Sequence, residues 1–331
     1  MNNFWKKKVV LITGYEGFLG SHLSKKLLDC NAKIIGLDIK VNRRKTILDR
    51  GNYKKIIVIK GSVTDLVLVK KLLKKYNVNI VFHLAAEAIV SKCNKEPLRT
   101  FDTNIRGTWS ILEACRIYNR VESIIIASSD KAYGDSGDLP YKESTALNGL
   151  HPYDSSKSCA DLIAQTFANT YNLPVVITRC GNIYGPGDFN FSRIIPDALR
   201  CIFDKNTLLI RSDGKSIRDY IYVEDIINGY ILLAEKLTQL QLHGEAFNFS
   251  ANRPITVLNL LNQINKLCKN QVKLKYRILN QARHEIKHQY LSSQKAKRII
   301  NWTPKHTLKM GLQKTIPWYF KNYPLLREEN T

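Results

Sequence analysis

The sequence predicts an α/β protein with a doubly wound parallel sheet and a smaller C-terminal lobe. Short, almost continuously apolar segments alternate with longer amphipathic segments through the first half of the chain. Such alternation is typical of parallel strands that are buried on both faces, with helices between them. A glycine-rich turn separates the first apolar segment from the first amphipathic one. After Gly185 the alternation weakens, which favours a strand–helix–strand half followed by a less regular one.

The expected elements follow from this periodicity. Strands are predicted at residues 8–13, 33–38, 55–60, 80–84, 123–128 and 174–178. Helices are predicted at residues 17–28, 64–75, 98–118 and 153–171, and a last helix at 308–319. We expect residues 1–184 to form the sheet domain, with 217–246 returning to it, and 185–216 and 247–331 to form the smaller lobe.

The composition argues against several classes of protein. A chain of 331 residues, 44% of them hydrophobic, has enough apolar material for a sizeable core. No apolar run approaches the roughly 18 residues of a membrane span, and the run after Lys8 stops at Thr13, too early for a signal peptide. We therefore expect no membrane partner and a cytoplasmic location. The seven cysteines include no Cys-x-x-Cys pair, which predicts reduced thiols, no disulfide framework and no metal site.

The net charge of +23 raises the question of a nucleic-acid partner. The lysines are spread along the whole chain, and no basic motif interleaved with aromatic residues appears. We therefore expect no nucleic acid. A basic surface also attracts an anionic pyrophosphate, which suits the motifs described next.

The glycine-rich turn is the first functional motif, and it reads Gly14-Tyr15-Glu16-Gly17-Phe18-Leu19-Gly20. It follows the first expected strand and opens the first expected helix. Glycines permit a tight turn and a close approach of the backbone to a pyrophosphate, and the helix N-terminus offers free N–H groups. In this context the motif predicts a Rossmann-type dinucleotide site, formed by Gly14, Gly17, Phe18, Leu19 and Gly20.

Further candidates for the cofactor site follow the next strands. A carboxylate at Asp38 suits the adenosine ribose hydroxyls and repels a 2′-phosphate, which favours NAD over NADP, although Lys40, Arg43 and Arg44 lie close by. Asp65 is placed to reach the adenine or to cap the helix that follows it. The small residues of Leu84-Ala85-Ala86 allow a cofactor to lie against the backbone.

Candidate catalytic groups end the fifth expected strand and begin the next helix. Tyr153 and Lys157 are four residues apart, so they share one helix face. An ammonium beside a phenol stabilises the phenolate, and lowering a tyrosine pKa from about 10 to about 7 takes roughly 4 kcal/mol. A phenolate accepts a proton from a sugar hydroxyl, and a serine of Ser128-Ser129-Asp130-Lys131 orients that hydroxyl.

With these motifs the chain resembles the extended short-chain dehydrogenase/reductase family over almost its whole length. The matching segments are Gly14 to Gly20, His83 to Ala86, Asn104, the Ser129 region, Tyr153 to Lys157, Arg179 to Gly185, and Arg218 to Asp225. Within the family the chain looks most like the nucleotide-sugar 4,6-dehydratases, and among those like the CDP-glucose 4,6-dehydratases. That closer resemblance is carried by Phe4-Trp5-Lys6, Ser129-Asp130-Lys131, Gly187-Asp188, Arg193 to Pro196, and His284-Glu285.

The resemblance implies roles for the catalytic candidates. Ser129, Tyr153 and Lys157 would carry the redox step, and Asp130 would protonate the departing 6-hydroxyl. Related dehydratases hold Glu as the C5 base where this chain has Lys131. A lysine serves as a base only if its pKa is lowered; alternatively, Lys131 pairs with Asp130 or with a substrate phosphate.

The resemblance also implies a reaction, with alternatives. A 4,6-dehydratase oxidises C4, eliminates water across C5–C6 and returns hydride to C6. The stretches Ala132-Tyr133-Gly134 and Arg218-Asp219-Tyr220 look more like general epimerase/dehydratase members than like CDP-glucose enzymes, which leaves the nucleotide base open. A nucleotide-sugar 4-epimerase, which uses the same redox residues and needs no acid–base pair, is the alternative enzyme. A catalytically silent NAD-binding protein is the non-enzyme alternative, which the Ser129, Tyr153 and Lys157 set argues against.

Substrate and subunit contacts complete the prediction. A substrate phosphate or sugar is expected to meet Asn182, Arg193, Arg218 and Arg283, since amides and guanidinium groups suit phosphate oxygens. By resemblance, the expected partners are a nucleotide-diphosphate sugar and a second copy of the chain. In that homodimer, helices at 98–118 and 153–171 would form a four-helix bundle.

Overall fold

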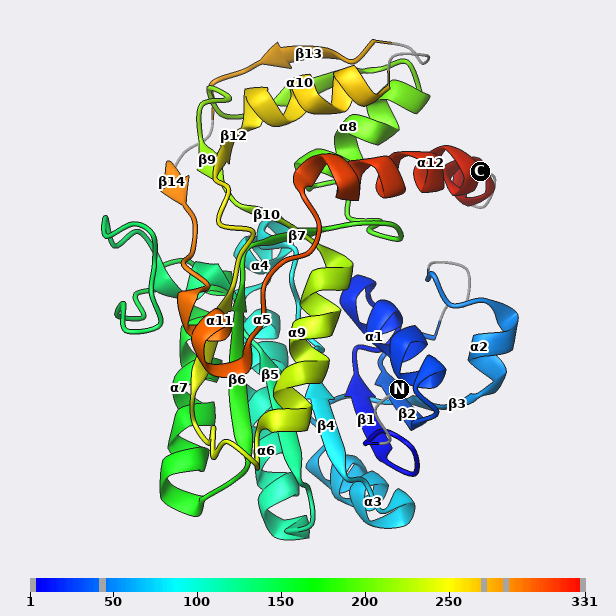
Figure 1. Cartoon of the computed structure of the whole chain (residues 1–331), viewed down its shortest axis with the longest axis vertical. Helices are drawn as coiled ribbons and strands as arrows, with labels where there is room; N and C mark the ends of the chain where they lie inside the picture. Colours follow the sequence, from blue (N-terminus) through cyan, green and yellow to red (C-terminus); the bar gives the residue numbers. More distant parts are fainter. Residues whose placement is uncertain (1–3, 42–45, 269–272, 282–285, 328–331) are drawn as a thin grey trace.

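A seven-stranded parallel sheet forms the centre of the computed structural model, which describes residues 4–41, 46–268, 273–281 and 286–327 (Figure 1). The strand order is β11-β6-β5-β4-β1-β2-β3, and each neighbouring pair runs parallel. The strands are β1 Val9–Thr13, β2 Lys33–Asp38, β3 Ile56–Lys60, β4 Ile80–His83, β5 Ser123–Ala127, β6 Val175–Cys180 and β11 Ala246–Phe249. The doubly wound α/β fold predicted from the sequence is confirmed, and the six predicted strands match within two residues at each end.

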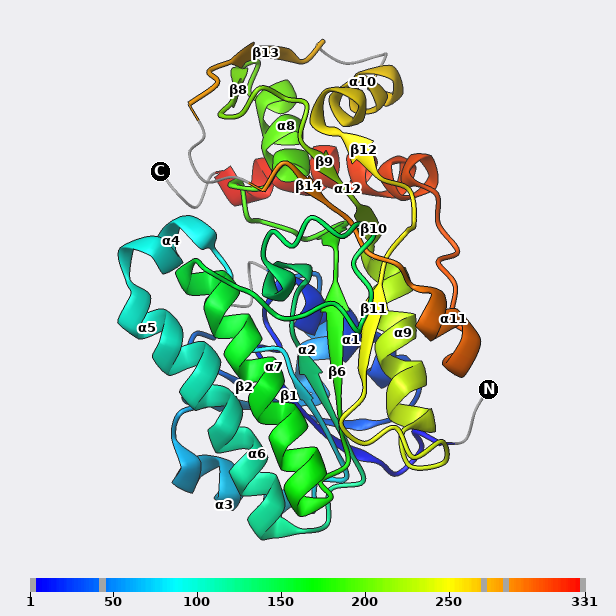
Figure 2. The same ribbon diagram turned by 90° about the vertical axis from the view of Figure 1, so that its left-hand side faces the viewer.

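Helices cover both faces of this sheet. One face carries α3 Leu66–Tyr76, α5 Pro97–Phe101, α6 Gly107–Tyr118 and α7 Pro152–Tyr171, and the other carries α1 Phe18–Asp29, α9 Val223–Lys236 and α11 Gln294–Ile300. Figure 2 shows α5, α6 and α7 on one side and α9 and α11 on the opposite side. The two faces bury separate apolar clusters, because the side chains of each strand alternate between them.

The predicted helix at 98–118 is interrupted. The structure has α5, then a π-helical turn at Asp102–Arg106, then α6. The turn contains the buried Asn104, whose side chain bonds both backbone groups of Glu87 and the hydroxyl of Ser156. A wider turn that aims one side chain at a neighbouring segment is a common reason for a π-bulge.

The C-terminal lobe lies beyond the carboxyl ends of the sheet strands (Figure 1). Its helices are α8 Ile194–Phe203, α10 Val257–Leu267 and α12 Leu308–Arg327. Two small sheets have two strands each: β7 Asn182–Tyr184 with β10 Tyr220–Tyr222, and β8 Thr207–Ile210 with β13 Lys275–Ile278. A third sheet consists of β9 Ile217–Arg218, β12 Ile255–Thr256 and β14 His288–Gln289. The last helix therefore continues past the predicted end at residue 319. The segment expected to return to the sheet domain contains α9, and β11 continues the return as far as Phe249.

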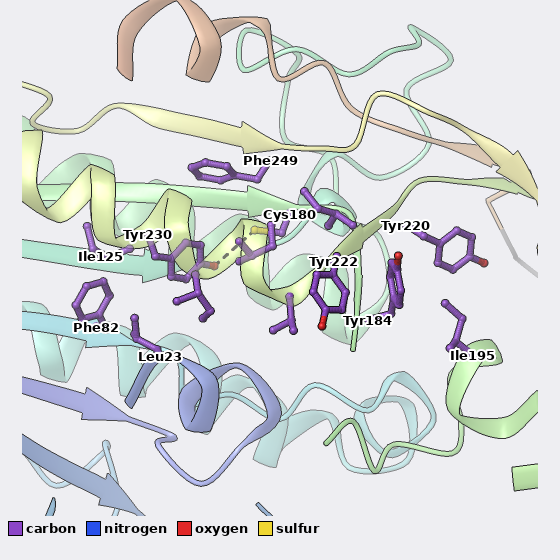
Figure 3. Close-up of a cluster of buried hydrophobic side chains, with 14 of the residues drawn as sticks. Leu23, Phe82, Ile125, Cys180, Tyr184, Ile195, Tyr220, Tyr222, Tyr230 and Phe249 are labelled. Carbon is purple, nitrogen blue, oxygen red and sulfur yellow. Dashed lines mark hydrogen bonds between the residues drawn. The ribbon is translucent and has the colours of Figure 1, made fainter. Parts of the chain in front are cut away.

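One continuous apolar cluster joins the sheet to the lobe (Figure 3). Phe82 and Ile125 contribute to it from the sheet, Tyr230 from α9, and Tyr184 and Ile195 from the lobe. The cluster fixes the lobe against the strand ends and so gives the space between them a defined shape. Among the described residues, no helix is both long enough and apolar enough to cross a membrane.

Candidate active site

A cavity of about 1750 Å³ lies between the carboxyl ends of the strands and the C-terminal lobe. In open α/β sheets, ligands bind at this edge. Its lining includes most of the predicted site residues: Gly14, Gly17, Phe18, Leu19, Gly20, Asp38, Leu84, Ala85, Ala86, Ser129, Asp130, Lys131, Tyr153, Lys157, Asn182, Arg193 and Arg218. Arg283 and His284 lie outside the described residues, as do Arg43 and Arg44.

The glycine turn has the geometry of a pyrophosphate cradle. Gly14 has φ +69°, and a Cβ there would lie 2.9 Å from the Ala85 Cα. A Cβ on Gly20 would lie 2.2 Å from the Gly14 carbonyl oxygen, so α1 packs against the turn only without one. Gly17 is the N-cap of α1 and brings no side chain to its first N–H groups. These features fit a dinucleotide phosphate at the helix start.

The strand ends beside the turn are held by a buried hydrogen-bond network. The Thr13 hydroxyl accepts from Leu84 N and Ala85 N, 3.2 Å each, so its proton points to His83 Nδ1 at 2.8 Å. His83 is fully buried, which lowers its pKa to about 3. The imidazole is therefore neutral and fixes the backbone of Leu84 and Ala85 at the cavity wall.

The two acidic cofactor candidates differ in position. Asp38 ends β2 at the cavity, where burial raises the pKa of its carboxyl, partly offset by the N–H groups of Lys40 and Glu16. Asp65 caps α3, since its side chain accepts from Leu68 N at 2.9 Å, and it does not line the cavity. Of the two roles weighed from the sequence, the structure shows the capping one.

The catalytic candidates of the fifth strand lie in a tight turn. The Ser129 hydroxyl donates to Asp130 Oδ1 at 3.1 Å and accepts from Lys131 N at 3.2 Å. Asp130 is only 5% exposed. Its burial raises the pKa of the carboxyl to about 6, against the opposing effects of Lys131, Ser129 and Arg218. A carboxyl with such a pKa retains a proton in part of the population near neutral pH.

Tyr153 and Lys157 begin α7 and line the cavity beside this turn. Burial raises the pKa of Tyr153 to about 12, while the Ser129 hydrogen bond and the charge of Arg193 lower it. Lys157 Nζ donates to the Ala127 carbonyl at 2.7 Å, and burial lowers the pKa of its ammonium to about 8. Burial thus outweighs the contributions of Ser129 and Arg193 to the phenol pKa. A lowering of that pKa by Lys157 together with a nicotinamide cation stays a prediction.

The charge of Lys131 acts on two buried carboxyl groups. Its positive charge lowers the pKa of Asp130 and that of Asp154, in both cases against the larger effect of burial. Asp154 occupies the first turn of α7, next to Tyr153. An interaction of Lys131 with Asp130 is one of the three roles that the sequence leaves open for this lysine, beside a C5 base and a partner of a substrate phosphate.

The predicted substrate residues contact the protein in different ways. Arg193 Nη1 donates to Asp188 Oδ2 at 3.0 Å, and its side chain stays 41% exposed. Arg218 is buried and donates to the carbonyls of Ile217 and Lys287, at 2.8 and 3.0 Å. Asn182 N and Nδ2 both donate to the Asp219 carbonyl. Three of the four predicted substrate residues, Asn182, Arg193 and Arg218, thus line the cavity.

Sequence reasoning missed the network that supports the catalytic turn. Arg179 forms a bidentate pair with Asp161, at 2.8 and 2.9 Å, and also donates to the Tyr133 hydroxyl at 2.8 Å. Gln289 Nε2, from β14, donates to the Asp130 carbonyl at 3.2 Å. Arg179 belongs to a segment that the resemblance already includes. Its buried partner, Asp161 of α7, belongs to no motif, so the sequence did not indicate this ion pair.

Comparison with known proteins decides the family. The family model described as GDP-mannose 4,6 dehydratase matches residues 11–315 of this chain. The chain belongs to this family. The predicted membership of the extended short-chain dehydrogenase/reductase enzymes and the resemblance to nucleotide-sugar 4,6-dehydratases are thereby confirmed.

Two curated relatives align with almost the whole length of this chain. A dTDP-D-glucose 4,6-dehydratase of Bos taurus is 30% identical over 333 residues, which cover 96% of this chain and 90% of that protein. The CDP-glucose 4,6-dehydratase of Salmonella typhimurium is 28% identical over 331 residues, which cover 96% and 92%. Both names are those of sugar-nucleotide dehydratases.

Solved structures of related enzymes superpose closely on the family member described here. A dTDP-glucose 4,6-dehydratase of Bacillus anthracis in complex with NAD has a TM-score of 0.84 at 28% identity, covering 96% of this chain and 98% of that one. A UDP-glucose 4-epimerase of Thermotoga maritima has a TM-score of 0.86 at 26% identity, covering 95% and 99%. The fold is therefore shared by dehydratases and epimerases, and only the site chemistry separates them.

Proposed function

We propose that this enzyme converts a nucleotide-diphosphate sugar into its 4-keto-6-deoxy derivative, with CDP-glucose as the substrate. The observation that carries the dehydratase assignment is the buried Asp130, whose pKa is raised to about 6, directly beside Ser129 in the cavity. An epimerase needs no acid at this position, whereas elimination of the 6-hydroxyl does. The choice of CDP rests on the resemblance of Ser129-Asp130-Lys131 to the CDP-glucose enzymes, since overall identity is 28% to a CDP-glucose enzyme and 30% to a dTDP-D-glucose enzyme.

NAD is the cofactor of this enzyme. Its pyrophosphate suits the turn from Gly14 to Gly20, its adenosine ribose suits Asp38, and its nicotinamide end suits the wall made by Leu84 to Ala86, near Tyr153 and Lys157. When bound there, NAD would supply the acceptor for a hydride from C4 of the sugar and the donor of that hydride to C6. A dinucleotide complex of a related dehydratase supports the assignment.

Tyr153 is proposed as the group that removes the C4 hydroxyl proton. The Ser129 hydroxyl lies within hydrogen-bonding reach of the phenol and favours its ionised form. Lys157, fixed by the Ala127 carbonyl, brings a positive charge to the same end of the cavity. The positive charge of a bound nicotinamide ring would lower the pKa of the Tyr153 phenol further, because a nearby positive charge favours the ionised form of an acid.

Asp130 and Lys131 are proposed as the acid and the base of the elimination. The carboxylic acid of Asp130 gives its proton to the 6-hydroxyl, which leaves as water, while Lys131 takes the proton from C5. The C5–C6 double bond forms from the C5–H electron pair, so atoms and electrons balance. Lys131 can act as this base only in its uncharged form, which makes its role the more demanding half of the pair.

The diphosphate is proposed to contact Arg193, Arg218 and Asn182, with Arg283 as a fourth group. Arg193 remains partly exposed although it pairs with Asp188. Arg218 already donates to backbone carbonyls. We therefore expect it to attract the diphosphate by its positive charge rather than by a bidentate pair of hydrogen bonds.

The alternative function is a nucleotide-sugar 4-epimerase. The close match to a UDP-glucose 4-epimerase structure favours it, as does the Ala132-Tyr133-Gly134 stretch. Both reactions begin with oxidation at C4 by the same three residues, Ser129, Tyr153 and Lys157. The two reactions differ in the next step, since only the elimination of water needs the acid that Asp130 supplies.

The domain division, subunit arrangement and location predicted from the sequence are also proposals. We propose a homodimer through a four-helix bundle of the segments 98–118 (α5 and α6) and 153–171 (α7), because these segments expose large apolar side chains: Leu98, Trp109, Ile117, Leu162 and Tyr171. The sheet domain is proposed to hold the cofactor and the C-terminal lobe the nucleotide sugar. A cytoplasmic location remains a prediction.

A panel of nucleotide sugars tests the proposed function. The purified chain is incubated with CDP-, dTDP-, UDP- and GDP-hexoses, and product mass is followed. Loss of one water from CDP-glucose supports the full proposal. Loss of water from another nucleotide sugar alone overturns the choice of CDP, and inversion at C4 with unchanged mass on every substrate replaces the dehydratase with the epimerase.

The variant Asp130→Asn separates the two halves of the reaction. The amide cannot donate a carboxylic proton, while Ser129, Tyr153 and Lys157 still carry the oxidation. In single-turnover mixing we expect reduced nicotinamide absorbance to build up while water loss slows by about 100- to 10,000-fold, the usual contribution of a general acid. Water loss at the wild-type rate would remove Asp130 from the elimination.

A further inference from the structure

Two carboxyl groups lie together at the adenosine end of the cavity. Asp38 ends β2, and Glu16 stands in the glycine turn immediately before Gly17; both line the cavity. The backbone N–H of Glu16 hydrogen-bonds the Asp38 carboxylate, and the negative charge of Glu16 raises the pKa of Asp38. The two side chains are therefore neighbours, although they are far apart in sequence.

Glu16 is held in place by two tyrosines. The hydroxyls of Tyr15, at 2.9 Å, and Tyr53 both donate to Glu16 Oε1. Tyr15 is fully buried against Gly36, where a Cβ would lie 2.5 Å from its ring, and Tyr53 is buried in α2 Arg50–Lys54. Hydrogen bonds from two anchored phenols to a carboxylate are strong and directional, so the position of Glu16 is built into the fold.

The charge at this end of the cavity is mixed. Lys40 also lines it, and its backbone N–H donates to Asp38 Oδ1 at 3.3 Å. The ammonium of Lys40 also brings a positive charge to the cavity lining, which opposes the repulsion of an added phosphate by Asp38. The carboxylate of Glu16 restores a negative balance among these three groups.

We propose that Glu16 is a second determinant of cofactor choice, acting with Asp38 to exclude a dinucleotide that carries a 2′-phosphate. That phosphate brings a charge of about −1.5 to −2 next to the adenosine ribose. It is repelled by both carboxylates, whereas the ribose hydroxyls of NAD are neutral donors that a carboxylate accepts. Tyr15 and Tyr53 are positioning residues for Glu16.

Direct binding measures the effect without any turnover. The full chain, freed of nucleotide, is titrated with NAD and with NADP by calorimetry. In Glu16→Gln the amide oxygen still accepts from the tyrosines and only the charge is lost. We expect the Kd for NADP to fall about tenfold and the Kd for NAD to stay within about twofold, the size expected for one partly solvated unit charge.

Two controls separate charge from structure. Glu16→Asp keeps the charge on a shorter side chain, so discrimination against NADP should persist. Glu113→Gln removes the same charge from α6, where Glu113 pairs with Arg116 away from the cavity, so both Kd values should stay unchanged. The gain of Glu16→Gln should also shrink near 1 M salt, where charges are screened within about 3 Å.

Parallel changes for the two cofactors would overturn the inference. If Glu16→Gln weakens NAD and NADP equally, Glu16 only holds the turn; if neither Kd moves, it does not face the ribose. Wild-type protein that binds NADP more tightly than NAD would instead contradict the role of Asp38, which is a separate outcome. A melting curve for each variant shows that the folded protein was titrated.

Discussion

The carboxyl group of Asp130 lies where burial and neighbouring charges oppose each other. Burial raises its pKa, and Asp219 adds to the rise, while Lys131, Ser129 and Arg218 act the other way; the outcome is a pKa of about 6. A group whose folded pKa is above its unfolded value of about 3.9 holds its proton longer in the folded state. Burial therefore keeps Asp130 available as an acid, but it lowers the free energy of unfolding once the carboxyl group ionises.

Asp130→Asn should stabilise the protein at alkaline pH. The shift of about 2 pKa units corresponds to about 3 kcal/mol. The penalty is absent below the unfolded pKa, grows between about pH 4 and about pH 6, and is fully present above that range. We expect urea denaturation to give the variant a higher free energy of unfolding at about pH 8 and no advantage at about pH 4. An equal difference at both pH values would mean that ionisation is not the cause.

Tyr153→Phe should abolish turnover while cofactor binding survives. The ring still fills its buried place, but no hydroxyl remains to take the C4 proton. We expect activity to fall by at least about 100-fold, with the Kd for NAD changed by less than about threefold. Near-normal activity would exclude Tyr153 from the reaction.

At the scale of elements, the strands and the glycine turn were predictable because their signals are local. Continuous apolar runs define the buried parallel strands, and the spacing of Gly14, Gly17 and Gly20 defines the turn. The π-turn at Asp102–Arg106 was not predictable, since it depends on Asn104 meeting Glu87 and Ser156 from other segments. The state of a buried group such as Tyr153 likewise depends on contacts that a sequence does not display.

Asn104→Ala should destabilise the fold through this turn. The side chain is buried; it accepts from Glu87 N at 2.8 Å and donates to the Glu87 carbonyl at 3.1 Å and to Ser156 Oγ at 2.9 Å. Leaving these groups unpaired should cost about 1–3 kcal/mol in the free energy of unfolding.

Arg106→Gln is the matched control for Asn104→Ala. It breaks an exposed ion pair with Asp102 in the same turn, and exposed pairs contribute only about 0–1 kcal/mol. A loss for Asn104→Ala no larger than that of the control would show that the side chain does not maintain the turn.

For the whole molecule, the proposed homodimer rests on large apolar side chains that the single chain exposes to water. Trp109 and Leu162 are 45% and 53% exposed, on α6 and α7, which pack side by side on the same face of the sheet (Figure 2). Large apolar patches on a surface mark interfaces, because burying them releases ordered water. Neither Trp109 nor Leu162 lines the cavity, so we expect substitutions of these two residues to leave cofactor binding unchanged.

Trp109→Glu combined with Leu162→Glu should convert the proposed homodimer into monomers. A carboxylate buried in a dimer interface without a partner costs several kcal/mol, whereas on a monomer it is solvated. Light scattering after gel filtration should give about twice the chain mass for the wild type and the chain mass, 37.9 kDa, for the double variant, with the Kd for NAD preserved. Tyr276→Glu is the control: this tyrosine is also exposed, but lies on β13 in the C-terminal lobe, so the dimer should persist. A wild-type protein that is monomeric at micromolar concentration, or a double variant that stays dimeric, would place the interface elsewhere and leave these apolar side chains without a partner subunit.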